Sequence, residues 1–432
     1  MPDARSLVSR VRASRASKAI MIRVVGVAIG LLQSIVVARL GGPELRGVVA
    51  VFVSASSLIY LAASFDVGQQ VVHMCRSRGD FRPIRPLMRT AWLIYAGIAA
   101  LVALAFLPLD PAVSWLAIGG VAYLMGSQSS LVLGAMRGPV ASAWASLGQQ
   151  LVLLAGVIAV AGAGVLNSTT VKLVVIASFL TPLPFFWLMV RAGRVVGAAP
   201  APNGLEAEPP TPSTPTAAPT PVRELTRDVV RAVRGGFPWQ LGRTLQWSVM
   251  LIDTILVGFY LGDAAAGIYA VGFSLTVVPR LVGGQIAVDV YHRATVADEH
   301  TLTRDLVKTL AGTTVAAVAV AAVAPFVVNV LYGPEFSEGL QVYLVLTVSV
   351  IAQALVQVSY QFTRVYGRPW PTVAYSVLGP ALMLATSGWA LGAFGVVGMA
   401  WVSGAASVLM VVPAVLLARR LERQPEPSGA AR

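Results

Sequence analysis

Three arginines lie inside strongly apolar stretches of this sequence, where charged side chains are rare. They are Arg23, Arg243 and Arg280. A charge at the centre of a membrane span costs roughly 2.5 to 3.5 kcal/mol, so it usually faces a partner or a water-filled cavity. A guanidinium presents a fork of donors that matches phosphate oxygens. We therefore predict that the three arginines bind an anionic headgroup; the structural alternatives are snorkelling for Arg23 and an ion pair for Arg243 or Arg280.

One acidic residue, Asp253, also lies well inside an apolar stretch, ten residues beyond Arg243. On a helix this spacing is roughly 15 Å, which is too long for a direct salt bridge. A buried carboxylate can bind a proton when it is desolvated, or Na⁺ when other oxygens join it. Asp253 is thus a candidate site for a coupling ion, H⁺ or Na⁺. A carboxylate hydrogen-bonded to a neighbouring helix is the structural alternative.

Uncharged polar side chains add to these candidates. Four glutamines within apolar stretches are predicted to line a polar cavity: Gln33, Gln246, Gln285 and Gln357. Glutamine can equally tie two membrane helices together. The three histidines fall in predicted loops without metal-ligand spacing, and we expect no metal site, cofactor or catalytic constellation. A membrane-embedded polymerase or acyltransferase is the enzyme alternative, and it would need catalytic side chains in a cavity or a sizeable outer loop.

Composition shows which elements must position these residues. Of the 432 residues, 56% are hydrophobic and only 12% are charged, which is too apolar for a single water-soluble core. Runs long enough for a membrane helix recur along the chain, and we predict about twelve such helices. The fold is predicted to be all-α, because the runs do not alternate as barrel strands do. The predicted spans are 20–40, 47–72, 90–109, 115–136, 139–162, 171–191, 237–260, 266–288, 308–331, 340–362, 372–391 and 393–417.

Most of the 32 Lys and Arg residues lie on one side of these spans, the side that holds both ends of the chain. Cytoplasmic loops retain basic residues, so both termini are predicted to be cytoplasmic. This topology explains most of the net charge of +13, and nucleic-acid binding is not expected. The single cysteine, Cys75, excludes an internal disulfide. Arginine far outnumbers lysine, a bias typical of GC-rich genomes, and we infer a multi-pass protein of a bacterial inner membrane.

The sequence contains two similar halves at an offset of 220 residues. The matched pairs are Arg23 and Arg243, Gln33 and Asp253, Gly42 and Gly262, and Gly47 and Gly267. We predict two pseudo-symmetric six-helix bundles, flanked by a basic N-terminal segment and a cytoplasmic tail. Between the bundles we expect a disordered Pro-rich linker and a basic amphipathic helix that contacts anionic lipids. In chain order, the predicted bounds of these five parts are 1–19, 20–191, 192–236, 237–417 and 418–432.

Short motifs in both halves resemble one family of membrane transporters. After the first span, Ala38-Arg39-Leu40-Gly41-Gly42-Pro43-Glu44-Leu45-Arg46-Gly47 is similar to the A-R-L-L-G-P-x-x-x-G turn of Wzx-type polysaccharide flippases. In the second half, the run from Asp253 to Gly258, then Leu261-Gly262 and Gly267-Ile268-Tyr269-Ala270, resembles the family's D-x-x-x-L-G, L-G and V-G-x-Y-x pattern. Leu331-Tyr332-Gly333-Pro334-Glu335-Phe336 resembles its L-F-G-x-x-F/Y turn. The order of these motifs along nearly the whole chain favours the Wzx family, which belongs to the multidrug/oligosaccharidyl-lipid/polysaccharide (MOP) exporter superfamily.

The resemblance implies a two-bundle transporter that moves an undecaprenyl-diphosphate-linked oligosaccharide to the outer leaflet by alternating access. It implies that Arg23, Arg243 and Arg280 bind the diphosphate and that an H⁺ or Na⁺ gradient acts through Asp253. The implied partners are the lipid-linked glycan and the polysaccharide polymerase and export machinery. Lipid II flippases and multidrug exporters of the same superfamily are alternatives, although three cavity arginines would repel a cationic drug. A scaffold for a polysaccharide assembly complex is the non-transport alternative.

Overall fold

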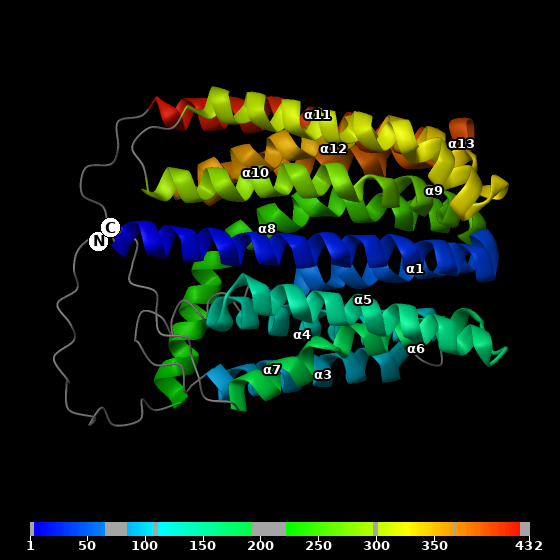
Figure 1. Ribbon diagram of the computed structural model, residues 1–432, viewed down its shortest axis with the longest axis horizontal. Coiled ribbons are helices and arrows are strands. Elements are labelled where there is room, and N and C mark those ends of the chain that lie inside the picture. The colour runs from blue at the N-terminus through cyan, green and yellow to red at the C-terminus, as the bar shows by residue number, and fades with distance from the viewer. Residues whose placement is uncertain are drawn as a thin grey trace. The chain divides into compact units, whose positions relative to one another are not determined.

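In the computed structural model, every regular element is a helix within the described residues, which confirms the predicted all-α fold (Figure 1). The structure describes residues 4–64, 84–106, 111–191, 222–296, 301–366 and 368–423. Residues 192–221 of the predicted linker, the end of the predicted tail and Cys75 lie outside these ranges.

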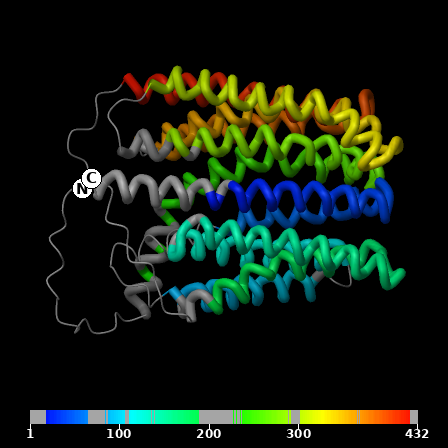
Figure 2. The backbone as a smooth tube through the Cα atoms, viewed as in Figure 1, coloured from blue at the N-terminus to red at the C-terminus, as the bar shows by residue number. Residues whose placement is uncertain are grey.

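Helices occupy nearly all of the described part of every predicted span, although the spans 171–191, 266–288 and 308–331 are each divided between two elements. Those of the first half are α1 (Ala4–Ala63), α3 (Ile84–Phe106), α4 (Pro111–Arg137), α5 (Pro139–Gly162), α6 (Ser168–Leu180) and α7 (Pro182–Arg191). Those of the second half are α8 (Val222–Leu261), α9 (Asp263–Leu275), α10 (Val277–Val296), α11 (Leu302–Phe326), α12 (Glu338–Val365) and α13 (Pro369–Glu422). A π-helix, η1 (Val327–Tyr332), and a 3₁₀ turn, η2 (Pro334–Phe336), lead from α11 to α12. Figure 2 traces this path as a tube.

Among the described residues, nine helices are long and apolar enough to cross a membrane, or ten if the bent pair of α9 and α10 is one span. Two of the nine are much longer than the roughly 20 residues that a crossing needs: Met21–Ala63 has 43 residues and Pro369–Glu422 has 54. Each consists of two helices that meet at a glycine, Gly42 in α1 and Gly395 in α13. The chain is a multi-pass membrane protein, and the total of about twelve spans stays a prediction.

The sequence repeat aligns two turns of the same backbone geometry. Gly42 has φ 65° and ψ −170°, and Gly262 has φ 86° and ψ 175°. Residues with a side chain rarely adopt this conformation, so glycine permits the sharp turn from one helix to the next. The match between Gly42 and Gly262 in the sequence is therefore a match in structure.

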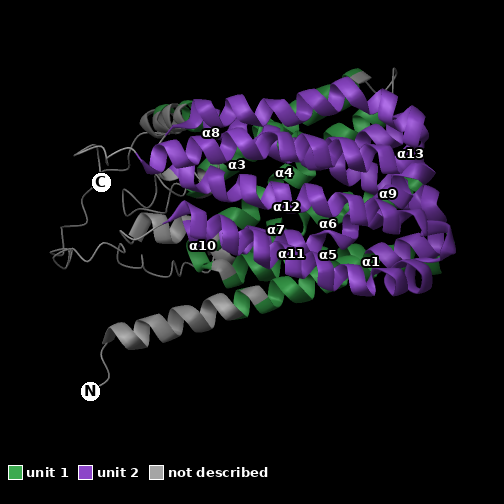
Figure 3. Ribbon diagram, turned by 90° about the horizontal axis from the view of Figure 1, so that it is seen from above, with its two compact units in different colours: residues 1–33, 59–237 green, residues 34–58, 238–432 purple. Residues whose placement is uncertain are grey.

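The helices group into two compact units, which Figure 3 shows in different colours. Unit 1 contains Met1–Gln33 and Ile59–Phe237, and unit 2 contains Ser34–Leu58 and Pro238–Arg432. This division differs from the predicted bundles because a segment of the first half, Ser34–Leu58, groups with the second half. The chain thus changes unit twice within α1 and once within α8.

Polar contacts hold the segment Ser34–Leu58 in unit 2. The hydroxyl of Tyr332, at the end of η1, donates to Ser34 Oγ at 2.8 Å. Nη2 of Arg46, a buried residue, donates to Ser274 Oγ in α9 at 2.9 Å. Both bonds join positions more than 200 residues apart in sequence, so tertiary contacts, rather than chain order, assign this segment to its unit.

One matched pair of the sequence repeat, Gly47 and Gly267, lies at a close helix crossing within unit 2. A Cβ on Gly47 would collide with the carbonyl of Asp263, and a Cβ on Gly267 would collide with the carbonyl of Pro43. Asp263 and Pro43 are themselves 220 residues apart, so the contact is reciprocal, as an internal two-fold repeat requires. Glycine at both positions lets the backbones touch.

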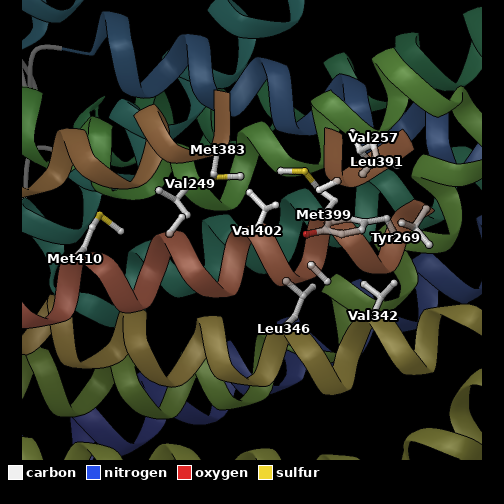
Figure 4. Packing of buried hydrophobic residues seen from close by; sticks show 14 of the residues in the cluster. Val249, Val257, Tyr269, Val342, Leu346, Met383, Leu391, Met399, Val402 and Met410 are labelled. Atoms are coloured by element: carbon white, nitrogen blue, oxygen red, sulfur yellow. The ribbon is translucent and has the colours of Figure 1, made fainter. Parts of the chain in front are cut away.

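Each unit has its own apolar core. In unit 1 the core includes Ile84, Met88, Trp92 and Phe186, and the rings of Trp92 and Phe186 meet edge to face with centroids 5.1 Å apart. In unit 2 a larger cluster lies among α8, α9, α12 and α13, as Figure 4 shows. Tyr269 lies within that cluster, and its hydroxyl is a polar group deep inside apolar packing. The core of unit 2 therefore surrounds a polar site.

Candidate functional site

A cavity of about 310 Å³ lies in unit 1 among α1, α4 and α5. No acidic side chain is present among the described residues that line it. The wall offers one cation, several hydroxyl groups and an amide, a combination that can hydrogen-bond an anion that also carries hydroxyl groups. The lining residues are Arg23, Tyr123, Gly126, Ser127, Ser130, Leu131, Gly134, Ser142, Ser146 and Gln149.

Helical spacing brings the polar residues of this wall together. On α4, Ser127, Ser130 and Gly134 are three and four residues apart, so they share one helix face. On α5, Ser142 and Ser146 are four residues apart and share a face in the same way. The sequence analysis did not predict this serine wall. The three-and-four spacing of small polar residues between 127 and 146 was the signal that could have indicated it.

Among the predicted site residues, Arg23 is the one that lines this cavity. Its helix packs closely on α5, where Gly30 lies beside the Gln150 amide and Gly26 beside Leu147. The Arg23 side chain is exposed, and the described residues give it no hydrogen-bonding or ionic partner. Its guanidinium donors are therefore available to a ligand.

In unit 2, Asp253 is 1% exposed and both of its carboxylate oxygens accept hydrogen bonds. Oδ1 accepts from the backbone N–H of Thr254 at 2.6 Å and from its hydroxyl at 3.3 Å. Oδ2 accepts from the hydroxyl of Tyr269 in α9 at 2.8 Å and from that of Ser403 in α13 at 3.5 Å. These donors compensate the burial of the charge. The geometry fits both the predicted ion site and the structural alternative.

Arg280 lies beside a break in a predicted span. The sequence predicted one continuous helix over 266–288, whereas the structure bends by 47° between α9 and α10. The physical reason is Pro279, which lacks the N–H that would bond the carbonyl of Leu275 and so interrupts the helix at Thr276. Broken helices often mark binding sites in transporters.

The Arg280 side chain folds back over this break. Its Nη2 donates to the hydroxyl of Thr276 and, at 3.5 Å, to the carbonyl of Phe273. The guanidinium carbon lies 3.8 Å from the centroid of the Phe273 ring, a cation–π contact. The Nε atom is buried and has no hydrogen-bond partner in the described part of the chain. Arg280 is therefore partly engaged within the protein and keeps one free donor position.

The charge of Arg280 also acts on Asp253, although no salt bridge joins these two described residues. Arg243 is half-buried on α8, and the helix is continuous from Arg243 to Asp253, which keeps the two side chains apart as predicted. Arg243 and Arg280 belong to unit 2 and Arg23 to unit 1. The predicted meeting of the three arginines at one diphosphate therefore stays a prediction.

The four predicted glutamines are not among the residues that line the cavity of unit 1. Gln33 is buried in unit 1 and is not among the residues lining the cavity, where Gln149 stands instead. Gln246 is buried in unit 2, and its Nε2 has no hydrogen-bond partner among the described residues. Gln285 and Gln357 are half-buried. Their predicted role in lining a polar cavity stays a prediction. No group of His, Cys, Asp or Glu that could hold a metal ion occurs in the described residues.

Comparison with known proteins finds no match in sequence but finds solved structures of similar fold. No protein-family model matches the chain, and no curated protein matches it in sequence. An inward-facing multidrug resistance MATE family transporter of the MOP superfamily is similar with a TM-score of 0.62 and 13% identity, over 95% of this chain and 99% of that one. The MATE multidrug transporter DinF-BH has a TM-score of 0.64 and 12% identity, over 94% of both chains.

The lipid II flippase MurJ, in an inward closed conformation, is also similar, with a TM-score of 0.57 and 10% identity over 93% of this chain and 87% of that one. Identities this low show the fold alone, and the resemblance to the Wzx family stays a prediction. The chain has the fold of these transporters.

Proposed function

We propose that this protein is a flippase that moves an undecaprenyl-diphosphate-linked oligosaccharide, the repeat unit of a surface polysaccharide, between the leaflets of a bacterial inner membrane. The observation that carries this proposal is the cavity of unit 1, in which Arg23 faces a wall of hydroxyl and amide groups. In this proposal Arg23 binds the diphosphate, and the serines with Gln149 bind sugar hydroxyls.

The chemistry of the cavity favours this substrate over a cationic drug. An arginine repels a cation, and none of the described residues in the wall is an acid that could compensate it. The volume of about 310 Å³ is at the small end of ligand pockets, which suits a diphosphate and the first sugar rather than the whole molecule. The prenyl tail then stays in the lipid. The fold is compatible with this activity, since a lipid II flippase also has it.

In this proposal, unit 2 couples transport to an ion gradient. Asp253 binds the coupling ion, and Arg243 and Arg280 assist with the diphosphate when the substrate passes. Transport proceeds by alternating access with both termini in the cytoplasm, next to the polymerase and export machinery. Anionic lipids contact the basic end of α8, whose sequence carries Arg227, Arg231 and Arg234.

The test is deletion of the gene followed by complementation with Arg23 variants. Mass spectrometry identifies the lipid-linked glycan, and a leaflet-selective probe shows on which side it accumulates. We expect deletion to trap the glycan on the cytoplasmic leaflet and to remove the surface polysaccharide. Arg23→Ala should fail to complement, and Arg23→Lys should complement in part because charge without the fork still attracts phosphate.

Arg89→Ala is the matched control, because Arg89 is an exposed arginine of the same unit that does not line the cavity. It should complement fully. Unchanged lipid-linked glycan after deletion would refute the proposal and favour drug export or a scaffold role. Accumulation of lipid II instead would assign the same cavity to the other flippase of this fold.

A further inference from the structure

A chain of buried hydroxyl groups leads away from Asp253 inside unit 2. The Ser403 hydroxyl lies 3.5 Å from Asp253 Oδ2 and 3.4 Å from the Ser349 hydroxyl. The Ser349 hydroxyl lies 2.8 Å from that of Ser407, which accepts a hydrogen bond from Gln353 Nε2 at 3.2 Å. Each of these four side chains is 2% exposed or less. Within the apolar core, each successive pair of polar atoms from Asp253 to Gln353 is thus 3.5 Å apart or less.

Helix geometry explains why the chain forms. Ser403 and Ser407 are one turn apart on α13, and Ser349 and Gln353 are one turn apart on α12. The two pairs face one another where α12 packs on α13, and they form two polar levels about 6 Å apart along the helices. Gln357 continues the four-residue spacing on α12 toward its C-terminal end, the predicted cytoplasmic side.

Unpartnered polar atoms lie toward the same predicted cytoplasmic end. Gln246 Nε2 on α8 and Ser376 Oγ on α13 are buried and have no hydrogen-bond partner among the described residues. Close contacts of Gly242 with Thr372, and of Gly379 with Val249, set α8 and the first half of α13 in a register that places Gln246 opposite Ser376. Buried groups of this kind usually bind water. Water at this level would lie on the predicted cytoplasmic side of Ser407.

The direction of the hydrogen bonds suits proton transfer. Gln353 can only donate through Nε2 and the carboxylate can only accept, so the three hydroxyls can align from donor to acceptor once Ser349, which also lies 3.4 Å from the Ser403 carbonyl oxygen, turns to the Ser403 hydroxyl. In that alignment Ser407 donates to Ser349, Ser349 to Ser403, and Ser403 to Asp253. Each hydroxyl that passes its proton forward receives one from behind, and a hydronium ion replaces the proton lost by Ser407. The net change is one proton moved from water to the carboxylate, with no oxidation.

We propose that Ser407, Ser349 and Ser403 form a proton path to Asp253, which Gln353 orients, and that the coupling ion is therefore H⁺ rather than Na⁺. The proposal rests on the coupling role given to Asp253 above. A Na⁺ ion at Asp253 would have to displace the N–H of Thr254 and push apart hydroxyl oxygens that now lie at hydrogen-bonding distance. A proton needs only that the hydroxyls rotate.

The charged and titratable groups that act on Asp253 come from two helices packed against it, Tyr269 on α9 and Arg280 on α10. The other two helices, α12 and α13, contribute the uncharged serine hydroxyls and the Gln353 amide. Tyr269 donates a hydrogen bond to the carboxylate, and Arg280 is the cation whose charge acts on it. In the proposal the serine hydroxyls deliver the proton to this carboxylate.

The test is time-resolved infrared difference spectroscopy on the full chain in lipid vesicles after a pH jump, without any glycan. The C=O stretch of a protonated carboxyl group reports Asp253 directly, and Asp253→Asn assigns the band by removing it. We expect the band to appear on acidification and to be unaffected by added Na⁺. Ser349→Ala should slow its appearance about tenfold or more while its final amplitude stays the same.

Two controls distinguish a proton path through these serines from a purely structural role. Ser359→Ala removes another buried hydroxyl of α12, one that bonds the Leu355 carbonyl within its own helix, and should leave the rate unchanged. Ser407→Thr keeps the hydroxyl and Ser407→Val has the same shape without it, so the rate should differ between these two variants whatever the added methyl group does to stability.

Equal rates for Ser349→Ala, Ser359→Ala and the wild type would overturn the path, as would equal rates for the two Ser407 variants. A carboxylate band that responds to Na⁺ but not to pH would overturn the choice of H⁺. Because the readout needs no glycan, failure of the proposed substrate would leave this result untouched.

Discussion

The two units place polar groups in apolar surroundings in opposite ways. In unit 1, Arg23 is exposed in a cavity and has no partner among the described residues, while serines of α4 and α5 form the opposite wall. In unit 2, Asp253 is buried, and Thr254, Tyr269 and Ser403 already satisfy its oxygens. Hydroxyl groups thus line a cavity in one unit and form a buried chain in the other.

The difference indicates what each site can bind. A hydrogen bond to a charged group contributes about 1.5 to 3 kcal/mol when the donor is otherwise free, so Arg23 gains much from an anion. A ligand that approaches Asp253 must replace bonds that the protein already makes, so only a very small ion gains. In our proposals unit 1 binds a large polar anion and unit 2 a proton, and the following predictions test this contrast.

The largest effect is expected from filling the cavity of unit 1 with Ser127→Trp. The indole would occupy space that the substrate needs, so complementation of the deletion should be abolished. The infrared band of Asp253 should remain, because Ser127 belongs to the other unit. Leu151→Trp is the matched control, since Leu151 is exposed on α5 outside the lining and tolerates bulk there. Loss of the Asp253 band in Ser127→Trp would mean that the two sites are not separable.

The second prediction concerns Asp253→Asn, which keeps the shape of the side chain and removes its charge. We expect transport to lose all dependence on the proton gradient, while the affinity for the lipid-linked glycan stays within about threefold of the wild type. Counterflow of labelled glycan in proteoliposomes, with and without an imposed gradient, measures both properties. Persisting gradient dependence would reduce Asp253 to a structural carboxylate.

The charged parts of both sites could be predicted from the sequence. Arg23 and Asp253 stand out because a charge in an apolar run is rare and costly, and this signal is local. The turn at Gly42 could be predicted from its match with Gly262 at the repeat offset. These features depend on neighbours in sequence, which is why pattern analysis finds them.

The uncharged parts could not be predicted in the same way. A serine in a membrane helix often bonds a carbonyl of its own helix, as Ser129 does outside the cavity and Ser146 does within its wall, so the sequence alone does not show which serines line a cavity. The chain from Ser403 to Ser349 depends on how α12 meets α13, and the grouping of Ser34–Leu58 with unit 2 depends on contacts with Tyr332 and Ser274. Tertiary packing decides all three.

A third prediction measures how firmly Asp253 is held. Tyr269→Phe removes one donor to Oδ2 and leaves the rest of the ring in place, so it should lower the free energy of unfolding by about 1 to 2 kcal/mol. The loss should be much smaller in the Asp253→Asn background, because the two side chains share the bond. Thermal unfolding in detergent of the four members of this cycle gives the coupling. Additive losses would show that the hydroxyl stabilises the fold through other contacts.

The smallest expected effect tests whether Arg280 binds the ligand, as Arg23 is proposed to do, or belongs to the internal network around Asp253. Arg280→Lys keeps the charge but loses the planar group over Phe273 and the bond to Thr276, so stability should fall by about 0.5 to 1 kcal/mol. Because these contacts already engage Arg280 within the protein, its change to lysine should weaken glycan binding less than Arg23→Lys does. Parallel measurements of unfolding and of glycan affinity on both variants separate the two effects. An affinity loss in Arg280→Lys equal to that in Arg23→Lys, with stability unchanged, would place Arg280 with the ligand-binding arginine of unit 1 rather than with the internal network around Asp253.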